Sequence, residues 1–377
     1  MDGGQDRADL TATGKLHFEV LDGLRGTAAI LVVLFHIMGM PSAGPDKGQW
    51  LHHAALAVDF FFGLSGFVIA YAYDERWTSM TIRQFILIRL VRLHPLVLLG
   101  AVLGLLSFLF DPSPHNQKSF PLGPLLSYFA LACLLLPYPA LPNRWTNTHS
   151  LNSPSWSLLQ EYVGNLIYAL LLRRLSTKAL GGVVILAGLG LLSIAYVKNS
   201  IDYGSDWTTS RLGYVRMGFS FTMGLWLYRV RSRGPKLRLG WGAASAILAA
   251  LFMLPLMPGS HGNGLFQAAL VMLAFPLLIL SGAHSEIGRR EMVLCRLAGR
   301  LSYPIYMLHC PFLYLYMNYV TFKKPEAGQQ ILAAAAIFAV VLLFSWVALT
   351  WFDEPIRRRL KPGPGRAPVP SASSPNC

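Results

Sequence analysis

The first residues able to do chemistry are a cation and a titratable base within one apolar run. Arg25 and His36 lie in the segment LDGLRGTAAILVVLFH, eleven positions apart. Along an α-helix, eleven residues make about three turns plus 20°, so both side chains project from one face, about 16 Å apart along the axis. Ionisable groups within a bilayer are costly unless they face protein or water, so this pair predicts a functional site. In the alternative, Arg25 extends to the membrane surface and His36 hydrogen-bonds another helix.

A second basic cluster lies in the segment RQFILIRLVRLHP, which contains Arg83, Arg89 and Arg92. Guanidinium groups pair bidentately with phosphate oxygens and keep their charge, so the cluster predicts a phosphate-binding site. The alternative is that these arginines only mark the cytoplasmic end of a span. The expected topology puts them on the same side of the membrane as Arg25, which favours a shared site.

Two carboxylates and a second histidine also fall within apolar runs. Asp59 lies near the outer end of the second run, and Glu161 lies about one and a half turns into a helix that enters from the outer face. We expect Glu161 at the depth of His36, where it would orient the imidazole and stabilise its protonated form. The alternative is a hydrogen bond from Glu161 to another helix. His309 is expected either to line the same cavity or to bond a neighbouring helix.

No metal site is predicted. The histidines show no HExxH or comparable spacing. The cysteines show no CxxC spacing, so neither a metal centre nor a disulfide framework is expected; they are Cys133, Cys295, Cys310 and Cys377.

Composition excludes an ordinary soluble domain. The chain has 377 residues, of which 54% are hydrophobic and 13% charged, whereas soluble domains carry about 25% charged residues. The net charge of +14 could suggest nucleic acid, but the basic residues gather at the ends of apolar runs. Orientation in a lipid bilayer explains that pattern, and no nucleic-acid partner is expected.

The apolar runs predict the topology. Eleven runs reach or approach spanning length, at about 22–40, 54–73, 86–110, 121–139, 156–172, 180–197, 214–230, 241–257, 264–281, 303–320 and 331–352. Basic segments predict the cytoplasmic side at 76–92, 173–178, 228–240, 284–300 and from 357 onward.

These assignments allow two crossings, not three, between residues 92 and 173. The run at 121–139 is short and bounded by prolines, so we expect a re-entrant or interfacial element on the outer side. The predicted fold is an all-α polytopic membrane protein of about ten transmembrane helices with both termini in the cytoplasm. Residues 1–21 are a cytoplasmic segment, 22–356 the transmembrane domain, and 357–377 a disordered Pro- and Ser-rich tail.

The motifs resemble those of the integral-membrane acyltransferase family three, whose members O-acylate bacterial surface glycans, nodulation factors and macrolides. The resemblance rests on Arg25 and His36 at their spacing, VDFFFGLSGFVI from Val58, RLVRLHP at 89–95 and PSWSLLQE at 154–161. It covers Leu21 to about Arg358.

The resemblance implies an enzyme of the bacterial inner membrane that moves an acyl group, expected to be acetyl, from cytoplasmic acyl-CoA to a hydroxyl of a carbohydrate-like acceptor on the outer side. It implies His36 as general base, with Glu161 and Arg25 as catalytic partners. An acyl-histidine intermediate is the alternative mechanism. The resemblance also implies that CoA is bound by Arg83, Arg89 and Arg92. The acceptor would be bound by Asp59, Ser65, Trp156 and His309.

A different class of function also fits an intramembrane cluster of charged residues. A transporter could use Arg25, His36, Asp59 and Glu161 as a substrate or proton path. Many transporters carry internal repeats, and this sequence shows none. We therefore expect the acyltransferase.

Overall fold

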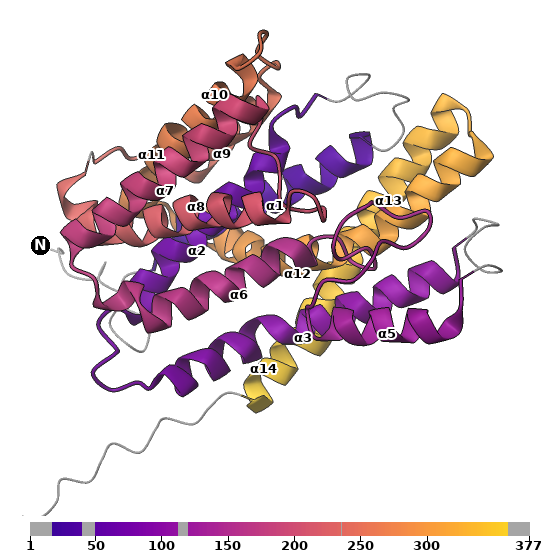
Figure 1. Ribbon diagram of the computed structural model, residues 1–377, viewed down its shortest axis with the longest axis horizontal. Helices are drawn as coiled ribbons and strands as arrows, with labels where there is room; N and C mark the ends of the chain where they lie inside the picture. Colours follow the sequence, from indigo (N-terminus) through magenta and orange to yellow (C-terminus); the bar gives the residue numbers. More distant parts are fainter. Residues whose placement is uncertain (1–16, 40–49, 112–119, 235, 361–377) are drawn as a thin grey trace, which may run out of the picture.

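The computed structural model describes residues 17–39, 50–111, 120–234 and 236–360. Within these ranges the chain is helical without a β-strand, and a single bridge joins Asn147 to Asp206. The helices pack side by side along a common direction (Figure 1). The predicted all-α class is confirmed.

The helices have these bounds: α1 Glu19–Gly39, α2 Ala57–Tyr73, α3 Ile82–Leu109, α5 Leu122–Cys133, α6 Ser155–Leu170, α7 Thr177–Lys198, α8 Ser210–Val230, α9 Trp241–Met253, α10 Gly262–Ala269, α11 Phe275–His284, α12 Arg289–Lys323, α13 Ala327–Val347 and α14 Glu354–Leu360. Short 3₁₀ turns cover Ala54–Leu56, Leu172–Arg174 and Arg231–Arg233, and π-helical turns cover Leu270–Ala274 and Ala348–Asp353.

Six helical stretches of the described residues are long and apolar enough to cross a bilayer. They are Glu19–Gly39, Ala54–Tyr73, Ile82–Leu109, Thr177–Lys198, Gly262–His284 and Ala327–Leu360. Helices α8 and α12 have 21 and 35 residues and contain more polar side chains, whereas α6 and α9 have 16 and 13 residues. The protein is therefore an all-helical membrane protein.

Helix α5 is a short helix of 12 residues beside α3, and the course of the chain after it, rather than its length, distinguishes it from a crossing. It packs against α3, and the rings of Phe108 and Phe120 lie 5.9 Å apart near the outer end of α3. After α5 the chain folds back on itself, and the Tyr138 N–H donates to the Thr148 carbonyl at 3.0 Å. This geometry agrees with the expected re-entrant element.

The basic segments expected in the cytoplasm meet at one end of the bundle. Arg229 on α8 pairs with Asp74 at 2.8 Å, and Arg173 lies over the Trp77 ring at 4.2 Å. Arg300 in α12 pairs with Glu354 at 2.6 Å. Arg89, Arg92, Arg300 and Arg357 also line one cavity, which joins the two groups at the same end of the bundle.

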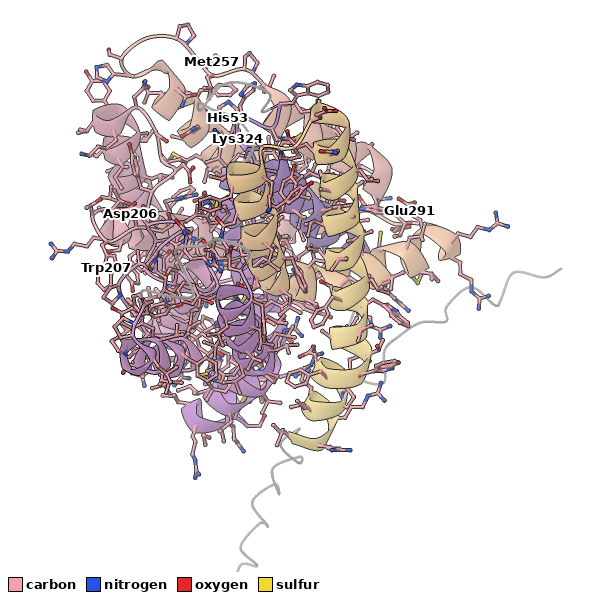
Figure 2. All side chains as sticks on the ribbon, turned by 90° about the vertical axis from the view of Figure 1, so that its right-hand side faces the viewer. His53, Asp206, Trp207, Met257, Glu291 and Lys324 are labelled. Atoms are coloured by element: carbon pink, nitrogen blue, oxygen red, sulfur yellow. The ribbon has the colours of Figure 1, made fainter. Side chains whose placement is uncertain are left out.

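The opposite end carries the loops expected outside. Figure 2 looks onto this end and labels Asp206, Trp207 and Lys324 on the connections between helices. The Thr148 N–H donates to the Ser205 carbonyl at 2.8 Å, which joins the loop after α5 to the loop after α7.

Two expected boundaries are wrong. Residues 284–300 were expected to form a cytoplasmic loop around a span at 303–320, but α12 already begins at Arg289. This early start packs on α1, since a Cβ on Gly26 would lie 2.5 Å from the Ala298 Cβ. Residues 357–360 were expected in the disordered tail but form the end of α14. The rest of that tail and residues 1–16 lie outside the described residues.

Glycines bring two helix pairs into close contact. Helix α1 packs on α12, and α2 packs on α8. A Cβ on Gly66 of α2 would overlap the Phe221 carbonyl of α8, and one on Gly224 would overlap the Gly63 carbonyl. Small residues allow such backbone approach in membrane bundles. These contacts hold α1 to α12 and α2 to α8 around the candidate site.

Candidate active site

Two cavities lie between the helices in the described part of the bundle. The outer chamber, of about 390 Å³, is lined by residues that include His36, Trp145, Trp156, Asp202 and His309. The inner chamber, of about 400 Å³, is lined by residues that include Ser65 and several charged groups: Asp22, Arg25, Arg89, Arg92, Glu161, Arg300, Glu354 and Arg357. Arg25 and His36 thus face different chambers from the two ends of α1.

His36 and His309 meet in the outer chamber. His36 Nδ1 lies 3.1 Å from His309 Nε2, and the two rings stack with centroids 5.2 Å apart. His309 is fully buried on α12. The rings of His36 and Trp145 lie 5.1 Å apart. Trp145 belongs to the loop after α5, which therefore covers the imidazole from the outer side.

The hydrogen bonds of His309 determine the tautomers of both neutral rings. His309 Nδ1 lies 2.7 Å from the Tyr306 carbonyl oxygen and 3.2 Å from that of Ile305. Carbonyl oxygens only accept, so this nitrogen carries the proton and His309 Nε2 accepts. The proton between the two rings then belongs to His36 Nδ1. His36 Nε2 is left as an unprotonated base.

Cys310 lies beside this pair. Its Sγ is 3.5 Å from His309 Nε2, and the possible ligand atoms of His36, His309 and Cys310 lie within 4.8 Å of one another. Three such ligand atoms can hold a metal ion. The same distances are also expected for two hydrogen-bonded imidazoles with a thiol beside them. The interpretation without a metal stays a prediction.

Glu161 does not pair with His36, contrary to our expectation. Its Oε1 accepts from Arg89 Nη2 at 2.8 Å and from Ser65 Oγ at 2.8 Å, and it lines the inner chamber. Helix α6 begins at Ser155, and Trp156 already lies at the depth of His36 in the outer chamber. Glu161 therefore lies further inward, at the depth of Arg89.

The inner chamber collects arginines from several helices. Arg92 interacts electrostatically with Arg25, Arg89 and Arg357 and also with the Asp353 carboxylate, but among the described residues it forms no ion pair. The Nε of buried Arg89 has no hydrogen-bond partner. The positive charge of Arg92 and the unpaired N–H of Arg89 both favour the binding of an anion in this chamber.

The arginines of this chamber differ from the expected set. Arg83 is exposed and does not line either chamber as described. Arg300 and Arg357 were missed, although the expected topology had placed their segments on the same side.

Asp59 is part of a buried ion pair and does not line either chamber among the described residues. It accepts from Arg216 Nη2 at 2.7 Å, and both side chains are almost fully buried. Arg216 also donates to the Tyr203 carbonyl at 2.7 Å and lies near Asp202 at 3.3 Å. The position of Arg216 inside the apolar run at 214–230 was a signal for this pair. Asp59 therefore holds α2 to α8.

Tyr306 lines both chambers. Its hydroxyl lies 2.7 Å from Ser157 Oγ, which in turn donates to the Pro154 carbonyl at 3.0 Å. Because the Ser157 proton is used there, the Tyr306 hydroxyl is the donor between the two side chains. Its ring meets Phe61 edge to face at 5.2 Å. These side chains separate the inner chamber from the outer chamber.

A bundle with a basic inner chamber and an imidazole in an outer chamber has the arrangement of a membrane-embedded group-transfer enzyme. A family model described as an acyltransferase domain matches residues 18–350. The chain belongs to this family, acyltransferase family 3, and is an acyl-transferring enzyme. The membership favours this class over the transporter.

Curated relatives agree with that class. The chain is 37% identical to Protein 2 in picA locus of Rhizobium radiobacter, over 40% of this chain and 81% of that protein. It is 26% identical to Peptidoglycan O-acetyltransferase OatA of Listeria monocytogenes, over 90% of this chain and 55% of OatA. It is 25% identical to Acyltransferase MdmB of Streptomyces mycarofaciens, over 94% of this chain and 95% of MdmB. No solved structure matches the chain.

Proposed function

We propose that this enzyme moves an acyl group from cytoplasmic acyl-CoA to a hydroxyl of a glycan or glycoside on the outer side of the membrane. The proposal depends on one contact: His36 Nδ1 lies 3.1 Å from His309 Nε2, and the tautomers that we assign to the two rings leave His36 Nε2 free as a base in the outer chamber. Acetyl is the proposed group, since one relative is named an O-acetyltransferase.

The donor fits the inner chamber by charge. CoA carries several phosphates, and guanidinium groups bind phosphate oxygens strongly. Arg92, which forms no ion pair among the described residues, and the unpaired Nε of Arg89 would take phosphate oxygens. Arg25, paired with Asp22 at 3.1 Å, would lie along the path of the pantetheine arm.

The thioester must pass Tyr306 to reach His36. The Tyr306 hydroxyl, held by Ser157 at 2.7 Å, closes the direct path between the chambers. A rotation of this side chain would join the two chambers and let a narrow pantetheine arm through. While the path is closed, water from the outer chamber is kept from the thioester.

The chemical step uses the free nitrogen of His36. His36 Nε2 takes the proton of the acceptor hydroxyl while the hydroxyl oxygen attacks the thioester carbonyl. The C–S bond then breaks, the ester forms, and the CoA thiolate receives the proton from the imidazolium. His309 positions His36 through the Nδ1 hydrogen bond. In the alternative, Nε2 first accepts the acyl group itself and then passes it to the hydroxyl.

The topology of the proposal is that of a bacterial inner-membrane protein. We add α6, α8, α9 and α12 to the six helices that meet the length and hydropathy requirement, which gives ten crossings. Both termini then lie in the cytoplasm, where acyl-CoA is found.

The test compares His36→Ala with a histidine variant outside the site. Purified protein in lipid nanodiscs receives acetyl-CoA and methyl glucoside, and both CoA release and acetylated product are measured. His36→Ala should lose about 10³-fold in rate, whereas His52→Ala, a histidine outside both chamber linings, should keep normal activity. Full activity in His36→Ala would contradict the proposal. Uptake of the glycoside into sealed vesicles without acetyl-CoA would support a transporter.

A further inference from the structure

The two chambers differ in the sign of their charge. Five arginines and three carboxylates line the inner chamber: Arg25, Arg89, Arg92, Arg300 and Arg357, against Asp22, Glu161 and Glu354. The outer chamber is lined by Asp202 and Asp206 and, among its described residues, by no lysine or arginine. The chamber that would receive the acceptor is therefore acidic.

The negative charge of Asp202 is not neutralised by its neighbour. Arg216 carries one positive charge, and the fully buried Asp59 already balances it at 2.7 Å. Asp202 lies at 3.3 Å from the same guanidinium, but its side chain is 50% exposed. Two carboxylates thus share one cation, and the surplus charge is on the exposed one, in the wall of the outer chamber.

Asp206 contributes differently to the same wall. Its carboxylate accepts from the backbone N–H of Thr208 at 2.9 Å and that of Thr209 at 3.0 Å, and from both hydroxyls. Neutral donors hold this charge in place without cancelling it, and they lower the pKa of the Asp206 carboxyl. Asp206 therefore stays ionised, while its role in the turn makes Asp202 the better residue to vary.

Aromatic side chains complete the wall. Trp145 and Trp156 both line the outer chamber, and a flat ring offers apolar area to the CH face of a sugar while polar groups bind its hydroxyls. Uncharged hydroxyls can donate to Asp202, whereas a carboxylate or phosphate on the acceptor would be repelled.

We infer that the outer chamber selects acceptors without negative charge, and that Asp202 is the residue that rejects anionic glycosides. This inference deepens the proposed function and rests on it. According to this inference, the acceptor is a neutral or cationic glycoside. Uronic acids and phosphorylated sugars are excluded as acceptors.

The test uses two acceptors that differ in charge and both lack the C6 hydroxyl. Full-length protein in nanodiscs receives acetyl-CoA with methyl 6-deoxyglucoside or methyl glucuronide at pH 7, and kcat/KM is measured from the acetylated product. The neutral glycoside should be preferred about tenfold or more. In Asp202→Asn, which keeps an oxygen to accept from Arg216, that preference should fall to about threefold or less. Glu326→Gln removes an acid before α13 that lines neither chamber as described, and should keep the wild-type preference.

Each outcome has a separate meaning. Equal use of both acceptors by the wild-type protein would overturn the inference and leave the proposed function standing. The same preference in Asp202→Asn as in the wild type would remove Asp202 from its role. If neither these glycosides nor methyl glucoside were acetylated, the proposed function would fail and the inference with it.

Discussion

His36 Nδ1 donates to His309 Nε2 at 3.1 Å, and His309 is itself held by the Tyr306 carbonyl at 2.7 Å. The proposed base and the histidine that contacts it therefore come from α1 and α12, the two helices that pack most extensively on each other. In many catalytic sites a carboxylate has this orienting role. In the proposed site the imidazole of His309, held by the Tyr306 carbonyl, takes the place of that carboxylate.

Replacement of His309 should lower the rate more than substrate affinity. In His309→Ala, His36 loses the acceptor for its Nδ1 proton, so the Nε2-protonated tautomer becomes available and kcat should fall about 100-fold. His309→Gln, whose amide oxygen can accept the same proton, should recover part of that loss. The readout is kcat and KM for acetyl-CoA across pH 6–9. Equal activities of the Ala and Gln variants would argue against an orienting role.

Arg92 should matter for donor binding. Arg92→Ala removes a guanidinium that lines the inner chamber and forms no ion pair among the described residues, so KM for acetyl-CoA should rise about tenfold or more with a small change in kcat. Arg83→Ala is the matched control, because Arg83 lies on the same helix but is exposed outside the inner chamber. A similar rise in KM for both variants would indicate a general effect of surface charge.

Glu161 should act on the donor side. Glu161→Gln replaces the carboxylate that pairs with Arg89 at 2.8 Å, so Arg89 should shift and KM for acetyl-CoA should change several-fold. The pH profile of kcat, which reports His36, should keep its shape, because Glu161 lines the other chamber. A displaced profile in this variant would restore Glu161 as the partner of His36.

The contact between α2 and α8 should not tolerate a larger residue. A Cβ on Gly66 would overlap the Phe221 carbonyl, which is backbone and cannot move aside cheaply. Gly66→Ala should cost about 1–3 kcal/mol in stability, visible as a lower midpoint of thermal unfolding in detergent. Gly218→Ala on α8, where a Cβ would meet nothing within 4 Å, is the matched control and should unfold at the wild-type temperature or slightly above.

Sequence patterns were sufficient to predict where the helices lie and which helix ends meet. Hydropathy located all eleven apolar runs on helices of the structure, since a bilayer requires long apolar segments with internal hydrogen bonds. The spacing of Arg25 and His36 placed them correctly on one helix. Basic residues indicated which helix ends meet, because charge follows membrane orientation.

The partner of His36 could not be predicted, because depth in the membrane depends on where each helix begins. We assumed that α6 starts at the outer surface, which put Glu161 level with His36. In the structure Trp156 already lines the chamber of His36, so Glu161, more than one turn further along α6, reaches Arg89. Likewise, an arginine inside an apolar run signals a buried ion pair but not its partner, and Asp59 and Arg216 are 157 positions apart.

The tautomer of His36 is the most direct test of the mechanism. Solid-state ¹⁵N NMR of histidine-labelled protein in lipid distinguishes protonated from unprotonated ring nitrogens, and the His36→Ala spectrum identifies the His36 signals. The hydrogen bond to His309 predicts a protonated Nδ1 and an unprotonated Nε2 at pH 7.5. A protonated Nε2 in the resting enzyme would contradict the assignment of this nitrogen as the base.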